Sequence, residues 1–239
     1  MRSSLGPTLV SAALALGATG AACAQSGRVA SADSALPPAR RPVAGIASTA
    51  WDTEVRRDRV GEADRVFTLL ALAPGTRVAD IGAGAGYYTT RLARRLGSGA
   101  TVYAEDIHQT ILDTLAARLA RERIAGVTLM LGEPDDPKLP PASVDLALLS
   151  HMYHEIARPY DFLFNLHPAL APGARVAVID SDRPTESHGT PPALLRCEMA
   201  ALGYREVSFD KLEPAEGYLA VFAAPDTLPR PAAVVACTS

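Results

Sequence analysis

A run of side chains that can accept or transfer a proton lies between positions 150 and 155. The run reads SHMYHE and combines a serine, two histidines, a tyrosine and a glutamate. Such side chains act as general bases or contact an acceptor group when they line a pocket. The candidate catalytic residues are His151, Tyr153, His154 and Glu155, and Ser150 is a candidate cofactor contact. For His154, a hydrogen-bonded structural histidine is the alternative interpretation.

The same run raises the question of a metal site. His151 and His154 are only three residues apart, and no third ligand is identifiable in the sequence, so no metal ion is expected. A long polar loop follows Asp180 and supplies two further candidates for substrate contacts, Arg183 and His188. An ordinary surface loop is the alternative for that segment.

Three alternating glycines follow an acidic residue in the segment VADIGAGAGYYTTRLA. Asp80 belongs to an apolar run typical of a strand, and Gly82, Gly84 and Gly86 stand between that run and a helical pattern. Glycine adopts positive φ and lets the backbone approach a ligand, and a helix N-terminus offers free N–H groups to an anionic group. The three glycines are therefore candidate cofactor contacts, and a merely tight strand–helix connection is the alternative.

Two adjacent acids, Glu105 and Asp106, end the next apolar strand about twenty residues beyond the first glycines. A carboxylate at this position can accept hydrogen bonds from ribose hydroxyls, which suits either NAD or S-adenosylmethionine. The dinucleotide fingerprint G-x-G-x-x-G would need a glycine at position 87, where the chain has Tyr87. An NAD-dependent oxidoreductase is therefore the less favoured alternative.

The elements that position these residues alternate along the chain. Short apolar strands separated by amphipathic helices predict a doubly wound, mostly parallel sheet with helices on both faces, an α/β fold. The last two strands are joined by a short turn with no room for a crossover helix, so they predict an antiparallel C-terminal hairpin. The seven expected strands are 77–81, 101–104, 127–131, 144–149, 174–179, 205–212 and 218–223.

With these motifs in order, the chain resembles the class I (Rossmann-like) S-adenosylmethionine-dependent methyltransferases over about residues 52–224. The family's first motif matches Asp80 to Gly86, and its ribose acid falls on Asp106, with Glu105 second. Its acidic loop after the third strand resembles GEPDDPKLPPASVD. That resemblance places Asp135 or Asp136 at the adenine amino group. It implies S-adenosylmethionine as cofactor and methyl transfer to a small-molecule acceptor as activity.

The first 24 residues have the pattern of a signal peptide. Arg2 precedes an apolar run over about 9–18, and Ala22 and Ala24 give an A-x-A site before Gln25. The run is too short to span a membrane. We expect a periplasmic or secreted protein, with lipidation at Cys23 as a minor alternative. The HMYHEI and HGTPP segments are similar to an exported bacterial subgroup of predicted methyltransferases.

The expected organisation is a signal peptide (1–24), a linker or N-terminal arm (25–50), a methyltransferase domain (51–224) and a flexible tail (225–239). A net charge of −3 gives no electrostatic case for a nucleic-acid partner. Arginine clusters such as Arg56, Arg57 and Arg59 are interpreted as solvated helix faces. The sequence says nothing of the oligomeric state.

Two points stay open in the sequence. Cys197 and Cys237 remain after cleavage, and a disulfide between them is permitted but cannot be inferred. Export of an unfolded chain would also separate the protein from cytosolic S-adenosylmethionine. A non-catalytic exported protein that keeps the cofactor-binding fold is therefore an alternative to the enzyme.

Overall fold

The computed structural model describes Met1 and residues 35–46, 54–215 and 217–238. The predicted signal peptide, the lipidation alternative at Cys23 and most of the predicted linker lie outside the described residues. None of the helices in the described part combines the length and apolarity that a membrane crossing requires.

A seven-stranded sheet forms the centre of the fold, with strand order β3-β2-β1-β4-β5-β7-β6. The first five strands are parallel, and β7 runs antiparallel to both β5 and β6. This confirms the predicted doubly wound sheet and its C-terminal hairpin. The strands are β1 (Arg77–Ile81), β2 (Thr101–Asp106), β3 (Val127–Leu131), β4 (Val144–Ser150), β5 (Leu170–Asp180), β6 (Arg205–Lys211) and β7 (Tyr218–Ala223).

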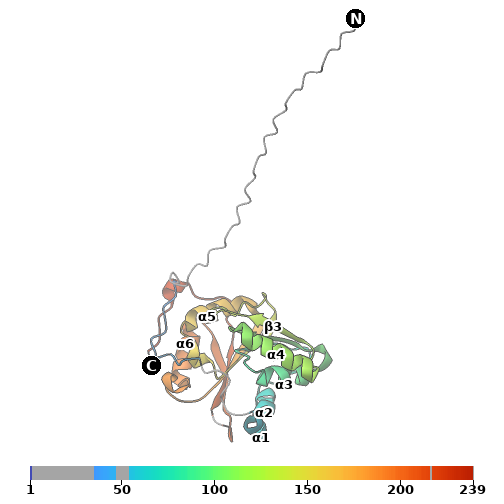
Figure 1. Cartoon of the computed structure of the whole chain (residues 1–239). Coiled ribbons are helices and arrows are strands. Elements are labelled where there is room, and N and C mark those ends of the chain that lie inside the picture. Colours follow the sequence, from blue (N-terminus) through green and yellow to red (C-terminus); the bar gives the residue numbers. More distant parts are fainter. Residues whose placement is uncertain (2–34, 47–53, 216, 239) are drawn as a thin grey trace. The chain divides into compact units, whose positions relative to one another are not determined.

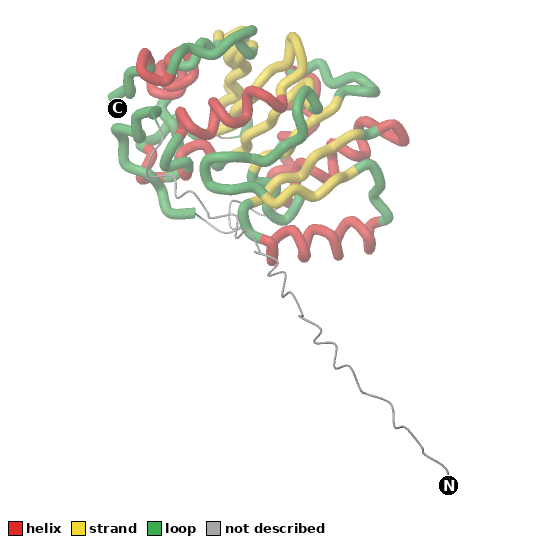
Figure 2. The backbone as a smooth tube through the Cα atoms, turned by 90° about the horizontal axis from the view of Figure 1, so that it is seen from above, coloured by secondary structure: helices red, strands yellow, loops and turns green. Residues whose placement is uncertain are grey.

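Helices cover both faces of the sheet (Figures 1 and 2). Alternate residues of each strand point to opposite faces, so Val78 packs with α2 and α3 while Ala79 packs with α5 and α6. Helix α4 packs against Ala104 of β2. The helices are α1 (Glu54–Arg59), α2 (Glu62–Leu69), α3 (Tyr87–Leu96), α4 (Gln109–Glu122), α5 (Pro159–Leu166) and α6 (Pro192–Ala201).

The C-terminal segment differs from the flexible tail that its composition predicts. A disulfide joins Cys197 of α6 to Cys237, and the Cys237 N–H donates to the Tyr160 hydroxyl at 2.7 Å. Val234 and Ala236 are buried beside them. The proline and alanine content predicted a loose segment. Composition could not reveal the order of this segment, because the disulfide and the apolar surface that hold it involve distant parts of the chain.

Reduction of the Cys197–Cys237 disulfide should destabilise the fold. The bond closes a loop with a sequence separation of 40 residues, and its loss should lower the free energy of unfolding by about 2–4 kcal/mol, chiefly by restoring entropy to the unfolded chain. Denaturant unfolding with and without reductant measures this. Cys197→Ser should be insensitive to reductant, and equal midpoints for the oxidised and reduced wild type would contradict the prediction.

The described part of the N-terminal arm, 35–46, lies against the domain beside a 3₁₀ turn, η3 (Tyr153–Glu155). The Ala44 N–H donates to the carbonyl of His154 at 3.2 Å, and Thr185 donates to the Pro42 carbonyl at 2.6 Å. Arg41 forms a buried ion pair with Glu198 of α6 at 2.9 Å. The arm therefore buttresses the turn that carries three of the candidate catalytic residues.

Candidate functional site

A cavity of about 400 Å³ opens where β1, β2 and β4 end. This is the place where doubly wound sheets bind ligands. It holds seven of the residues predicted from sequence: Gly82, Gly84, Glu105, Asp106, Ser150, His151 and Glu155. Six others lie outside its described lining: Asp80, Gly86, Tyr153, His154, Asp135 and Asp136.

The glycine loop after β1 requires glycine for two different reasons. All three glycines have positive φ, 66° at Gly82, 54° at Gly84 and 85° at Gly86, which side chains disfavour. A Cβ at Gly86 would also overlap the side chain of Leu115 in α4. Gly82 and Gly84 therefore offer their backbone to the cavity, whereas Gly86 lets α4 pack closely.

Asp80 stabilises the glycine loop through a contact with the helix that follows it. It is buried, and its carboxylate accepts a hydrogen bond from the Thr89 hydroxyl at 2.5 Å. Burial raises the pKa of Asp80 to about 6. The contact ties the end of β1 to the first turn of α3, so Asp80 positions the glycine loop instead of lining the cavity as a cofactor contact.

Asp106 lies at the edge of the cavity and is held by backbone groups. Its carboxylate accepts hydrogen bonds from the Gly84 N–H at 3.1 Å and from the His108 N–H at 2.9 Å. These contacts fix the carboxylate next to the glycine loop. Ile107 and Ile111 add apolar surface on the same side of the cavity. A carboxylate beside an apolar wall is what a ribose and an attached base require.

Glu105 also lines the cavity, but its carboxyl group has a strongly raised pKa. The side chain is 2% exposed, and one of its oxygens accepts a hydrogen bond from the Gly82 N–H at 3.3 Å. Burial raises the pKa of Glu105 to about 8, and the nearby carboxylates of Asp106 and Asp80 act in the same direction. This raised pKa favours the protonated form of Glu105, so Asp106 stays the predicted ribose contact.

Glu105 should make stability depend on pH. Its pKa is 4.5 when exposed and about 8 when folded, so between these values only the folded state keeps the proton, and stability falls as pH rises through this window. Glu105→Gln should remove a loss of about 3–5 kcal/mol between pH 5 and 9. Denaturant midpoints across this range measure the slope. The exposed Glu186→Gln is the control, and an unchanged slope in Glu105→Gln would contradict the assignment.

The loop after β3 carries acids inside and outside the described lining of the cavity. Glu133 and Pro134 line the cavity, whereas Asp135 and Asp136 do not. Backbone hydrogen bonds between Glu133 and Asp136, at 2.8 and 3.1 Å, close a tight turn. The turn directs Asp136 toward Lys138, with which it pairs at 2.7 Å. The acid that faces the cavity in this loop is therefore Glu133.

Arg57 is a cavity residue that the sequence did not reveal. Its guanidinium lies 3.6 Å from the centre of the Tyr87 ring, and it pairs with Glu62 at 2.6 Å. It also donates to the Ser150 hydroxyl at 3.4 Å. The side chain is only 12% exposed, so the interpretation as a solvated helix face was wrong for Arg57. The sequence feature that could have indicated its burial is the aromatic pair Tyr87–Tyr88, because the Arg57 guanidinium packs against these two rings.

The SHMYHE run is divided by the structure into two layers. His151 and Glu155 line the cavity, whereas Tyr153 and His154 are fully buried behind it. Burial, and then the charge of Arg57, hold the pKa of His151 below its usual value. His151 is thus neutral at pH 7, the state that a general base needs.

His154 has a partner that lies far along the chain. Its Nδ1 is 3.1 Å from both carboxylate oxygens of Asp180 at the end of β5. Asp180 in turn accepts hydrogen bonds from the Thr190 hydroxyl at 2.7 Å and the Ser181 N–H at 2.8 Å. The imidazole orientation of His154 is therefore set from behind the cavity.

The residues present fit S-adenosylmethionine. The Gly82–Gly84 backbone allows close approach of a ligand, Asp106 offers a charged acceptor, and Ile107 and Phe162 offer apolar walls. Among the described lining residues, carboxyl groups outnumber the one arginine, Arg57, which suits a ligand that carries a sulfonium and an ammonium group. The lining carboxyl groups are Glu54, Glu105, Asp106, Glu133 and Glu155.

Comparison with known sequences indicates a methyltransferase domain, in agreement with the geometry of the cavity. Residues 79–178 match the methyltransferase domain family. A trans-aconitate 2-methyltransferase of Mycobacterium tuberculosis is 30% identical over 164 residues, which are 66% of this chain and 59% of that protein. A nocamycin O-methyltransferase of Saccharothrix syringae is 33% identical over 88 residues, 37% of this chain and 31% of that one. The chain thus spans less than two thirds of either relative.

Solved structures show the same fold. A SAM-dependent methyltransferase from Aquifex aeolicus superposes with a TM-score of 0.66 at 19% identity, covering 73% of this chain and all of that one. The [4+2]-cyclase SpnF superposes with a TM-score of 0.61 at 15% identity, covering 79% and 88%. The chain therefore has the fold of the class I S-adenosylmethionine-dependent methyltransferases, and residues 79–178 match the methyltransferase domain family. S-adenosylmethionine is the cofactor that this family implies.

Proposed function

We propose that the protein transfers a methyl group from S-adenosylmethionine to a small-molecule acceptor, and that it does so after export. The observation that carries the proposal is one cavity that joins the Gly82–Gly84 loop and Asp106 to a neutral histidine, His151, and a carboxylate, Glu155. The first pair suits cofactor binding. The second pair suits an acceptor that has to lose a proton.

Methyl transfer from a sulfonium is an in-line displacement, so the protein chiefly has to align the acceptor and exclude water. Arg57 and the Tyr87 ring beneath its guanidinium close the cavity beside Ser150. His151 can take a proton from a hydroxyl or thiol acceptor. A carboxylate acceptor, as the name of the trans-aconitate relative indicates for that protein, would need no base and would be held by Arg57.

Export is supported by two independent features. The first 24 residues have the pattern of a Sec-type signal peptide. The Cys197–Cys237 disulfide is of the kind that persists in oxidising compartments. An alkaline-phosphatase fusion to the full chain tests the compartment. Phosphatase activity in the periplasm supports export. A fusion that keeps the first 24 residues but shows no phosphatase activity would oppose it.

Calorimetry with S-adenosylmethionine, S-adenosylhomocysteine and NAD tests the cofactor. We expect binding of both methionine-derived ligands and none of NAD. Release of S-adenosylhomocysteine in a screen of small carboxylic acids, phenols and thiols then tests turnover. His151→Ala should reduce turnover more than binding for acceptors that lose a proton, with exposed Glu186→Gln as control. Cofactor binding without any turnover would favour the non-catalytic alternative.

A further inference from the structure

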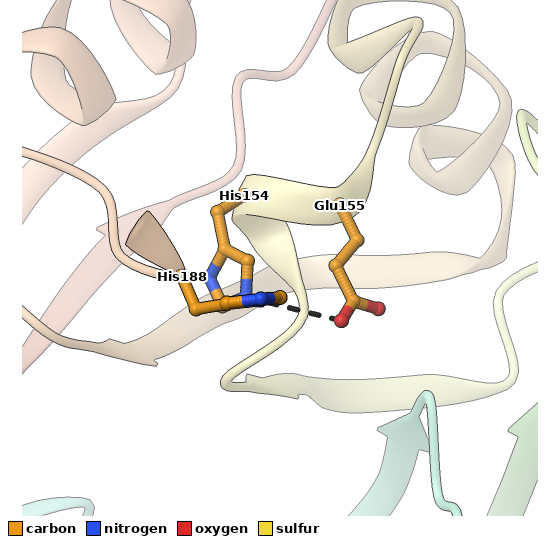
Figure 3. Close-up of side chains that lie close together, drawn as sticks. All are labelled: His154, Glu155 and His188. Atoms are coloured by element: carbon orange, nitrogen blue, oxygen red, sulfur yellow. Dashed lines mark ion pairs between the residues drawn. The ribbon is translucent and has the colours of Figure 1, made fainter. Parts of the chain in front are cut away.

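A cluster of metal-ligating groups lies beside the cavity. His154 and Glu155 come from the turn η3. His188 comes from the loop after β5, where it directly follows the short turn η5 (Thr185–Ser187). One ligand atom from each residue lies within 4.8 Å of the other two. Figure 3 shows the three side chains converging from these two segments. The fold thus supplies the third ligand that the sequence alone did not reveal.

The geometry of the cluster is set mainly by His154. Its ring is perpendicular to that of His188, with an interplanar angle of 85° and 5.5 Å between ring centroids. Its Nε2 lies 3.9 Å from Glu155 Oε1. Its Nδ1 faces Asp180 on the opposite side at 3.1 Å. The atom of His154 that faces the cluster is therefore Nε2, the nitrogen available for coordination when Nδ1 carries the proton.

The Asp180 contact is the second observation that indicates a metal. A metal-bound histidine usually donates its other ring N–H to a carboxylate, which fixes the tautomer and makes the ligand more basic. Asp180 is fully buried and is itself held by Thr190 and Ser181. This carboxylate–histidine arrangement is fixed before any ion binds.

We propose that His154, Glu155 and His188 bind one divalent transition-metal ion, with Zn²⁺ as the ion that suits them best. Two imidazoles and one carboxylate form the ligand set of catalytic zinc sites with an open fourth position. Calcium and magnesium prefer oxygen ligands throughout. Glu155 also lines the cavity, so the open position is directed to a ligand bound there, and an oxygen or sulfur atom of that ligand can complete the coordination.

Binding requires a small contraction of the cluster. In a tetrahedral zinc site with bonds of about 2.0–2.1 Å, neighbouring donor atoms are about 3.3 Å apart. His154 is fixed by Asp180, whereas Glu155 and His188 are half-buried and lie at the ends of short turns. These two side chains are therefore the ones that would have to rotate to close the distances. The proposal does not depend on methyl transfer.

The test is metal binding by the purified full chain. The protein is dialysed against a chelator and titrated with Zn²⁺ in a calorimeter, and its metal content is measured by mass spectrometry. We expect one ion per chain and a rise in the thermal midpoint on binding. His188→Ala should weaken binding by at least about 100-fold, and Asp180→Asn by about 10–100-fold.

His167→Gln serves as the matched control, because His167 bonds the Pro225 carbonyl outside the cluster. This variant should bind Zn²⁺ as wild type does. His188 is chosen over the buried His154 because its replacement leaves the core intact, and circular dichroism checks that the variant folds. Absence of stoichiometric binding, or equal affinity in His188→Ala, would overturn the proposal. Calorimetry with S-adenosylhomocysteine on the same samples reports the methyltransferase site separately.

Discussion

Replacing Arg41 by alanine is expected to lower the free energy of unfolding by about 3–5 kcal/mol. The side chains of Arg41 and Glu198 are both 0% exposed, and their Nε–Oε1 distance is 2.9 Å. Arg41 also donates to the carbonyls of Tyr153, His154 and Ile156 at 3.2–3.3 Å. Its removal takes the cation from a buried carboxylate and one donor from each of the three carbonyls, which is the costly way to break such a pair.

The thermal midpoint should fall by roughly 6–20 °C for a domain of this size. The neighbouring Arg40 is exposed, so Arg40→Ala is a matched control expected to change stability by less than about 0.5 kcal/mol. A double-mutant cycle with Glu198→Ala separates the pair from its surroundings. The double variant should lower the free energy of unfolding by less than the sum of the two single variants. Equal stability of Arg41→Ala and Arg40→Ala would contradict the prediction.

The same replacement should also disturb the cavity. The three carbonyls that Arg41 holds belong to η3 and to the residue after it, the segment that carries Glu155 into the cavity. The N-terminal arm therefore acts as a positioning element for the site. In the Arg41→Ala variant we expect slower release of S-adenosylhomocysteine with an acceptor present, even under conditions where the protein remains folded.

Asp106→Ala is the second change with a large expected effect, an increase of about 100-fold in the dissociation constant for S-adenosylhomocysteine. The carboxylate would supply the acceptor for the ribose hydroxyls, and a hydrogen bond to a charged group contributes about 1.5–3 kcal/mol. It also holds the glycine loop through the Gly84 N–H. Glu105 is a poorer acceptor at this position, because burial raises its pKa to about 8 and favours the protonated form.

Asp136→Ala is the matched control for Asp106→Ala. Asp136 pairs with Lys138 outside the cavity lining, so its loss should change the dissociation constant by no more than about twofold, within about 0.4 kcal/mol. Glu133→Ala should weaken binding instead, because Glu133 is the acid of that loop that lines the cavity. Calorimetry measures all three variants. Wild-type affinity in Asp106→Ala, or an equal loss in Asp136→Ala, would refute the assignment.

Local patterns were sufficient for the architecture. Apolar runs bounded by glycine and proline located the strands, because burial on both faces of a parallel sheet demands near-continuous apolar residues. The short connection before Tyr218 predicted the antiparallel hairpin, which the β5–β7 and β6–β7 pairings confirm. The largest difference in a strand boundary is at β5, which begins at Leu170 and not at the predicted 174, because Leu170 already pairs with Val144 ahead of an irregularity.

Side-chain direction in the loops could not be predicted in the same way. Asp135 and Asp136 have the right type and the right approximate position, but the turn that closes at Glu133 pairs Asp136 with Lys138. Helical periodicity likewise placed Arg57 on a solvated face, although the surface that covers it belongs to Tyr87 in another helix. A one-dimensional pattern contains no information about such partners.

The sequence by itself determined the sheet and the glycine loop that follows β1, because these follow from residue types at fixed local spacing. The class of cofactor came from the resemblance of the ordered motifs to the methyltransferases. Only the tertiary structure decided which groups meet: Cys197 with Cys237, Arg41 with Glu198, and His154 with Asp180, Glu155 and His188. Most of these contacts join segments far apart in the chain. Their formation depends on how the strands end and the loops return, which local spacing does not specify.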